Sequence, residues 1–195
     1  MYINKRTGMI IGTHCSCTGE SLVWWQRPFT GLINKFKQRQ SRTLVEQLDN
    51  GVKLFDLHIT YYRNNWYFSN GNAIYDIRLD EILKRMKKHS KPNKPIYYRL
   101  ILSKNIFNSK NIGLFKEFIE SIKDFNRNVI LLYAWVEGSE IYPFINKKKI
   151  DMAEKYYIRN NGIMPRYKHY AKRNNNIYIS DNTSDYLMLD FYEYK

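Results

Sequence analysis

The sequence predicts an α/β fold that forms a small (β/α) barrel of the TIM type, distorted or incomplete. Apolar blocks of strand length alternate along the chain with segments whose apolar residues recur at helical spacing. Successive strands that are joined by helices pair in parallel, and a ring of such strands is a barrel. The chain has 195 residues, slightly fewer than closed barrels usually have, so we expect missing helices or a partly open ring. This length also predicts a single domain over residues 1–195.

The first elements lead from a short strand into a long aromatic segment. Residues 8–13 contain a run of branched apolar side chains, which is typical of a buried strand. Residues 20–40 have no clear period, so an irregular segment is expected. Its aromatic residues lie among basic ones and either enter a membrane interface or cover one end of the barrel. Tryptophan is usually well buried, so we expect the covering role for these residues, which are Trp24, Trp25, Phe29 and Phe36.

A capped helix and an alternating strand come next. Thr43 and Glu46 have the spacing of a capping box, which predicts a helix over residues 43–49. An Asn-Gly pair ends this helix. Apolar side chains alternate over residues 52–60, which predicts the second strand, and a third short strand follows over residues 66–68.

The rest of the chain continues the alternation and then loses it. The expected elements are a helix with the apolar face Leu79, Ile82, Leu83 and Met86, a strand over 96–103, a helix with the face Ile112, Phe115, Phe118, Ile119 and Ile122, and a strand over 129–136. Beyond these, the weaker signals are a helix over 151–160 and short strands over 162–164, 177–180 and 186–191.

Composition points to phosphate-bearing partners without identifying them. Lys and Arg exceed Asp and Glu by 32 to 18, a net charge of +14. Anionic membrane headgroups and nucleic acid would both be attracted to such a surface, and an AT-rich coding bias also produces this richness in Lys, Asn, Ile and Tyr. No zinc-finger spacing, RNA-recognition signature or helix-turn-helix pattern is present, so no specific nucleic acid is expected.

The two cysteines indicate a reducing compartment. Cys15 and Cys17 are too close for an ordinary structural disulfide and too few for a zinc site without nearby histidine partners. Cys15 adjoins His14, which leaves a nucleophilic thiol as an alternative. No run resembles a signal peptide or a membrane span, so we expect a cytoplasmic or peripheral membrane protein.

The candidate chemistry begins where the first strand ends. The apolar run stops at Gly12, Thr13 and His14, and enzymes with barrels or open sheets place their sites at the carboxyl ends of strands. The alternative is a polar loop in which the histidine only forms a hydrogen bond.

Two stretches together carry a resemblance to a known family. The Gly12-Thr13-His14 strand end is followed some forty residues later by a strand with the pattern Gln-Leu-x-x-Gly-Val-x-x-Phe-Asp-Leu, which ends at Leu57. This order and spacing, over residues 8–75, resembles the X-domain of the phosphatidylinositol-specific phospholipases C, and the bacterial, calcium-independent branch is the closer one. The resemblance implies a distorted barrel of the phospholipase C-like phosphodiesterase fold.

The resemblance implies acid and base catalysis on an inositol phospholipid. In this family a substrate hydroxyl attacks the lipid's own phosphate while a first histidine takes its proton, and a second histidine protonates the leaving group. The first histidine corresponds to His14, and the second to Asn70, which cannot deliver a proton. The family's arginine corresponds to His58, which strand alternation places on the same side as Asp56. The residue after the first histidine, Asp or Asn in the family, is Cys15.

Two further positions match the family less closely. Lys104 follows a strand end where the family places a lysine near the substrate phosphate, and Asp190 resembles an aspartate that orients the first histidine. A solvated lysine and a surface or capping carboxylate are the alternatives. Calcium needs several oxygen ligands, and no matching carboxylate set surrounds Asp56. Neither a metal nor another cofactor is therefore expected.

Two functions follow from these positions. The first is a phosphodiesterase of the phosphatidylinositol phospholipase C type, a monomer in which His14 and His58 form a new acid and base pair and Asp190 and Asn70 assist. Asp56, Lys104 and Cys15 would then contact the substrate. The second is a catalytically impaired relative that binds phosphoinositides or other anionic phosphates.

Overall fold

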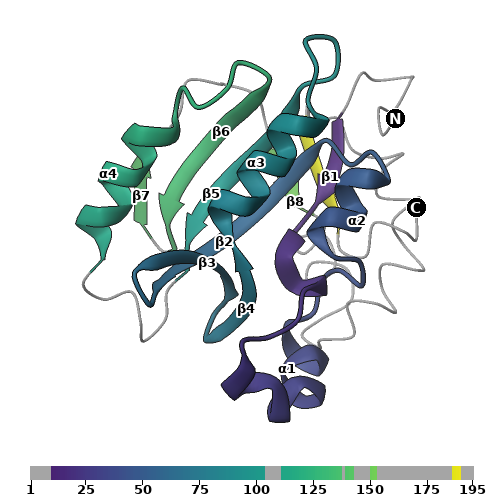
Figure 1. Cartoon of the computed structure of the whole chain (residues 1–195), viewed down its shortest axis with the longest axis vertical. Coiled ribbons are helices and arrows are strands. Elements are labelled where there is room, and N and C mark those ends of the chain that lie inside the picture. Colours follow the sequence, from purple (N-terminus) through teal and green to yellow (C-terminus); the bar gives the residue numbers. More distant parts are fainter. Residues whose placement is uncertain (1–9, 104–110, 138, 143–149, 153–185, 190–195) are drawn as a thin grey trace.

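One mixed β-sheet organises the chain, as Figure 1 shows. The computed structural model describes residues 10–103, 111–137, 139–142, 150–152 and 186–189. The strands are β1 Ile10–Thr13, β2 Leu54–Tyr62, β3 Asn65–Asn70, β4 Ala73–Arg78, β5 Ile96–Leu102, β6 Val129–Val136, β7 Ser139–Tyr142, β8 Ile150–Met152 and β9 Tyr186–Leu189. The α-helices are α1 Thr30–Lys37, α2 Leu44–Asp49, α3 Leu79–His89 and α4 Ile112–Ile122, and the short 3-10 helices are η1 Ser16–Gly19 and η2 Trp24–Phe29.

The centre of the sheet consists of parallel strands. The strand order is β7-β6-β5-β2-β1-β9-β8, and every neighbouring pair from β6 to β8 is parallel. The last described strand, β9, therefore returns to lie beside the first, which is the pairing that a ring of strands requires. Among the described residues the sheet stays open between β7 and β8.

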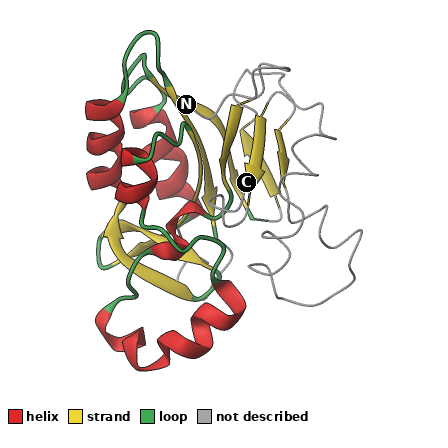
Figure 2. Cartoon of the chain, turned by 90° about the vertical axis from the view of Figure 1, so that its right-hand side faces the viewer, coloured by secondary structure: helices red, strands yellow, loops and turns green. Residues whose placement is uncertain are grey.

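The two faces of the sheet have different neighbours. Phe55, Leu57 and Ile59 of β2 belong to the main apolar cluster, which includes the inner faces of α3 and α4. Leu54 points to the opposite face, where it packs in a smaller apolar cluster with residues of β6 and β9. Since side chains alternate along a strand, Asp56 shares the face of Leu54. Figure 2 shows the helices gathered on one side of a curved sheet, so this aspartate points away from them.

Local signals explain the helices that flank the site. Thr43 and Glu46 form the complete capping box of α2, as the spacing predicted. The apolar face of α3 is buried at all four predicted positions. In α4 the predicted residues Phe115, Ile119 and Ile122 are buried and Phe118 is partly buried, but Ile112 is 43% exposed, so the prediction was wrong for Ile112. No described helix is both long and apolar enough to cross a membrane.

Two further sequence expectations were wrong, and one pairing was not predicted. Segment 20–40 is not irregular but contains η2 and α1. Strands β3 and β4 pair antiparallel, because turns with positive φ at Arg63 (47°), Asn64 (59°) and Gly71 (59°) allow hairpins in place of crossovers. Residues 150–152 form strand β8, where the start of a helix was expected. The expected strands 162–164 and 177–180 lie outside the described residues.

Gly12 sets the distance between the first two strands at the base of the site. A Cβ atom at this position would lie 2.2 Å from the carbonyl oxygen of Leu54 and 2.4 Å from its Cβ. We therefore expect Gly12→Ala to lower the free energy of unfolding by about 1–3 kcal/mol, the usual penalty of overpacking. Urea unfolding of the two proteins measures this, and Gly31→Ala, at a position with open space, is the control. Equal stability of Gly12→Ala and the wild type would contradict the close approach of these strands.

Candidate active site

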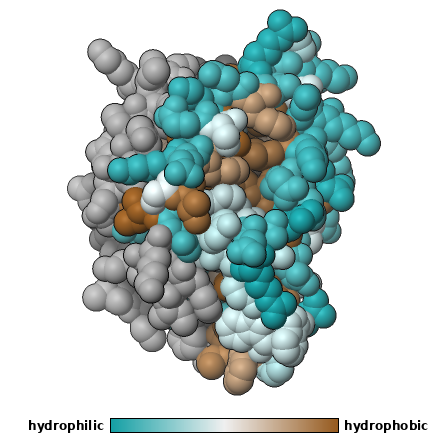
Figure 3. Space-filling model, turned by 60° about the vertical axis from the view of Figure 1, so that its left-hand side comes forward, coloured by the Kyte–Doolittle hydropathy of each residue, from teal (hydrophilic) through white to brown (hydrophobic). Residues whose placement is uncertain are grey.

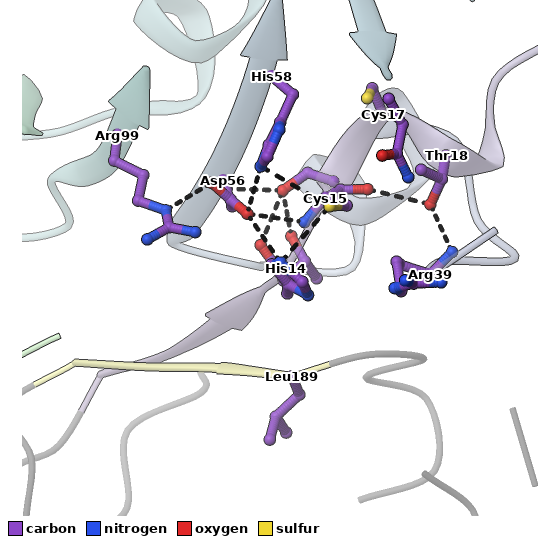
Figure 4. Close-up of polar contacts among 12 residues, drawn as sticks. His14, Cys15, Cys17, Thr18, Arg39, Asp56, His58, Arg99 and Leu189 are labelled. Atoms are coloured by element: carbon purple, nitrogen blue, oxygen red, sulfur yellow. Dashed lines mark hydrogen bonds and ion pairs between the residues drawn. The ribbon is translucent and has the colours of Figure 1, made fainter. Parts of the chain in front are cut away.

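The carboxylate of Asp56 is the centre of a buried polar cluster at the carboxyl end of β1 and in the middle of β2. Its Oδ2 accepts a hydrogen bond from the backbone N–H of Cys15 at 2.9 Å. The same oxygen lies 3.2 Å from Nε2 of His58 and 3.5 Å from Nε2 of His14. Asp56 is fully buried, and His14 is 3% exposed. Figure 4 shows these side chains converging on one point. The predicted placement of Asp56 and His58 on one side of the strand is confirmed.

Backbone hydrogen bonds fix His14 at the end of its strand. Its N–H donates to the carbonyl oxygen of Leu189 in β9 at 2.9 Å. The side-chain amide of Gln40 donates to the carbonyl oxygens of both His14 and Leu189, at 2.9 and 2.7 Å. Gln40 is fully buried. Gln40 therefore connects the carboxyl ends of β1 and β9.

The turn after His14 brings the thiol of Cys15 between the two imidazoles. Cys15 has a left-handed backbone conformation, with φ 43° and ψ 54°. Residues other than glycine seldom adopt this conformation. Its Sγ lies 3.5 Å from Nε2 of His14 and 3.7 Å from Nε2 of His58. Ser16 lies in the same turn. Its hydroxyl donates a hydrogen bond to the carbonyl oxygen of Thr13 and accepts one from the backbone N–H of Asp56. These hydrogen bonds connect the turn to β1 and to β2.

Arg99 on β5 binds the other carboxylate oxygen of Asp56, Oδ1. The parallel register places Arg99 opposite Asp56, and its Nε donates to Oδ1. The guanidinium carbon also lies 4.8 Å from the centre of the Trp135 ring. Arg99 is 3% exposed, so this is a buried ion pair stacked on an aromatic ring. Sequence reasoning missed Arg99, because only the register of β5 against β2 brings it to the site.

Charges within the cluster shift the pKa values of three of its groups. Burial opposes the ionised form of Asp56, but Arg99, His58 and His14 outweigh it and hold the pKa of Asp56 well below its usual range. Burial likewise raises the pKa of the Cys15 thiol, yet the neighbouring histidines lower it to about 7. Burial lowers the pKa of His58, and Cys15 with Asp56 raises it to about 10. His58 therefore keeps its positive charge at neutral pH.

Of the remaining predicted site residues, one lies away from the cluster and two lie outside the residues that the structure describes. Asn70, at the end of β3, donates its side-chain amide to the carbonyl oxygen of Lys37 at 2.8 Å, on the exposed side of the hairpin. Among the described residues this amide is therefore engaged with α1 and not with the imidazoles. Lys104 and Asp190 lie outside the described residues.

The cluster offers ligands of the kinds that metals bind. One possible ligand atom from each of His14, Cys15, Asp56 and His58 lies within 4.8 Å of every other. No comparable group of three or more such residues occurs elsewhere in the described part of the chain. The arrangement can therefore move a proton between imidazoles on a shared carboxylate, or hold a cation among four ligands.

Comparisons with known proteins relate the fold to bacterial phospholipases. No protein-family model matches the sequence, and no curated protein matches it. Solved structures of phosphatidylinositol-specific phospholipase C do match. The enzyme from Listeria monocytogenes has a TM-score of 0.61 at 16% identity, over 97% of this chain and 90% of that one. A mutant of the Staphylococcus aureus enzyme has a TM-score of 0.61 at 12% identity, over 100% and 90%. At such identity the chains share a fold, and the chemistry depends on the site.

Proposed function

We propose that this chain cleaves a phosphodiester bond of an inositol phospholipid, with His14 and His58 as paired proton carriers on Asp56. The observation that supports this most is that Nε2 atoms of two histidines reach the same carboxylate oxygen, at 3.5 and 3.2 Å. His14 directly follows β1 and His58 lies in β2, in a chain whose fold resembles bacterial phosphatidylinositol-specific phospholipases C. We further infer that the open sheet is part of a distorted barrel of this type.

Each side chain has a chemical task in this proposal. His14 accepts the proton of the substrate hydroxyl as that oxygen attacks phosphorus, and His58 donates a proton to the leaving oxygen. The positive charge of His58 also offsets the negative charge that grows on the phosphoryl oxygens. Asp56 orients both rings, and Arg99 orients Asp56. Lys104 and Asp190 keep their expected roles, contact with the phosphate and orientation of His14.

A second function is favoured by the burial of the site. His14, Cys15 and Asp56 are all less than 5% exposed, and the second histidine of the family is replaced by Asn70. A relative that has lost turnover would still bind anionic headgroups through its net charge of +14.

Turnover and binding on vesicles separate these two functions. The full chain, kept in a chelator, is mixed with vesicles of phosphatidylinositol or of phosphatidylcholine alone. The phosphodiesterase releases a water-soluble inositol phosphate from the first and nothing from the second. Binding to phosphatidylinositol vesicles without release supports the binding protein and contradicts the enzyme.

The segment around α1 exposes large apolar side chains that could contact such a membrane. Trp24, Phe29 and Leu32 are 65%, 59% and 62% exposed, which contradicts the expectation that Trp24 and Phe29 cover the barrel end. Trp25 does lie partly buried, and its indole donates to the hydroxyl of Tyr62. Figure 3 shows apolar side chains at the surface at its lower end, where Figure 1 places α1.

We expect Trp24→Ala with Phe29→Ala to weaken binding to anionic vesicles at least 10-fold, because burying each side chain in a membrane is worth about 1.5–3 kcal/mol. Vesicle sedimentation measures the affinity. Leu114→Ala is the matched control, since Leu114 on α4 is 42% exposed but lies far from this segment in the sequence. Unchanged sedimentation of the double variant would remove α1 from the membrane-binding surface.

A further inference from the structure

We propose that His14, Cys15, Asp56 and His58 form a four-ligand site for a zinc-type divalent cation. The sequence contained too few cysteines for a zinc site without nearby histidines, and the fold supplies two histidines. The two imidazoles, one thiol and one carboxylate are the ligand types that Zn²⁺ accepts together. Three of the four residues are buried and His58 is nearly so, so water would compete little with the ligands.

Four of the six distances between the ligand atoms match a tetrahedron. With metal–ligand distances of about 2.3 Å for sulfur and about 2.0–2.2 Å for nitrogen and oxygen, a tetrahedral site places sulfur and nitrogen about 3.5 Å apart and nitrogen and oxygen about 3.3 Å apart. Here Sγ of Cys15 lies 3.5 and 3.7 Å from the two Nε2 atoms. Oδ2 of Asp56 lies 3.5 Å from Nε2 of His14 and 3.2 Å from Nε2 of His58. Four of the six edges therefore have the expected lengths, and the other two are within 4.8 Å.

Surrounding groups hold the ligands in this arrangement. Arg99 engages Oδ1 of Asp56, which leaves Oδ2 directed at the cluster. The left-handed backbone of Cys15 turns its thiol toward the imidazoles, and its N–H fixes the same carboxylate. Partners of this second layer orient ligands and raise metal affinity in known sites. Figure 4 shows the four side chains meeting at one point, with Arg99 to the left of the Asp56 carboxylate.

Metal binding does not require the chain to be an enzyme. If the proposed function also holds, the cation would occupy both Nε2 atoms that carry protons, so the metal-bound form would be inactive and a chelator would restore turnover. This consequence rests on the proposed function, whereas binding itself does not.

Cobalt(II) absorption of the full chain tests the site directly. Four-coordinate Co²⁺ with a thiolate ligand has intense visible bands and a sulfur-to-metal charge-transfer band. We expect one equivalent of Co²⁺ to produce both in the chelator-treated wild type. Zn²⁺ should displace the cobalt, and Ca²⁺, which prefers six to eight oxygen ligands, should not. Zn²⁺ should also raise the unfolding temperature, because it binds the folded chain.

Variants assign the signal to individual ligands. Cys15→Ser should lose the charge-transfer band, and His58→Asn should weaken zinc binding by more than the roughly 10- to 100-fold that outer-layer partners contribute. Cys17→Ser is the control, because this thiol is also buried but donates to the carbonyl oxygen of Ser69, outside the four ligands. Circular dichroism shows that each metal-free variant is folded. A folded wild type without the thiolate band, or a Cys15→Ser variant that keeps it, would overturn the proposal.

Discussion

Replacing His14 by alanine should lower the turnover of phosphatidylinositol vesicles about 10²- to 10⁴-fold in chelator, the usual contribution of a general base. The imidazole is the group that would take the proton of the attacking hydroxyl. It is fixed for this by the hydrogen bond from its backbone N–H to Leu189 and by the amide of Gln40 on its carbonyl oxygen. Since these contacts involve only backbone atoms of residue 14, the alanine variant should keep them and remain folded.

A second histidine variant serves as the control for this measurement. His89 lies at the end of α3 and pairs with Asp49 at 3.6 Å, at the protein surface. His89→Ala should leave turnover within about 2-fold of the wild type, since surface substitutions away from special features change little. If His14→Ala were as active as His89→Ala, the proton would be taken by another group and the assignment of the base would be wrong.

Replacing Asp56 by asparagine should lower the free energy of unfolding at pH 7 by about 3–5 kcal/mol, the usual effect of removing one member of a buried ion pair. The variant keeps the shape of the side chain but leaves the buried charges of Arg99 and His58 without their carboxylate. Urea unfolding in the presence of chelator measures the loss without a contribution from metal.

The pH dependence of this loss identifies its cause. The pKa of Asp56 is well below its usual 3.8 in the folded chain, so its contribution is complete above the unfolded pKa and is lost as the pH falls through the folded one. The difference between wild type and Asp56→Asn should therefore be constant between pH 5 and pH 6 and should narrow as the pH falls below about 4. A difference that is equally large in strong acid would show that packing, and not charge, stabilises this position.

Local patterns in the sequence predicted most of the side chains that meet at the site. The strand end at His14, and the alternation that places Asp56 and His58 on one side of β2, depend on neighbouring residues only. The role of Arg99 depends on the register of β5 beside β2. The position of the Cys15 thiol depends on a backbone conformation that residues other than glycine rarely adopt. Contacts of these two kinds cannot be read from residue spacing.

The fold was predictable to a similar extent. Long amphipathic patterns identified α3, α4 and the parallel strands correctly. Helix α1 was missed, because Leu32 and Ile33 closely follow Pro28 and Gly31 and the short segment shows no clear apolar period in the sequence. Strand β4 was missed because a hairpin at Gly71, and not a helix, returns the chain to the sheet. Short elements of this kind are stabilised mainly by tertiary pairing.

Phosphorus NMR of the products formed by the chelator-treated wild type on phosphatidylinositol vesicles would decide the proposed chemistry most directly. If the hydroxyl of the inositol ring attacks its own phosphate between His14 and His58, the first soluble product is a cyclic inositol phosphodiester, and diacylglycerol remains in the membrane. The signal should be absent with His14→Ala and present with His89→Ala. A folded wild type that binds these vesicles and forms no cyclic phosphodiester would contradict phosphodiester cleavage at this site.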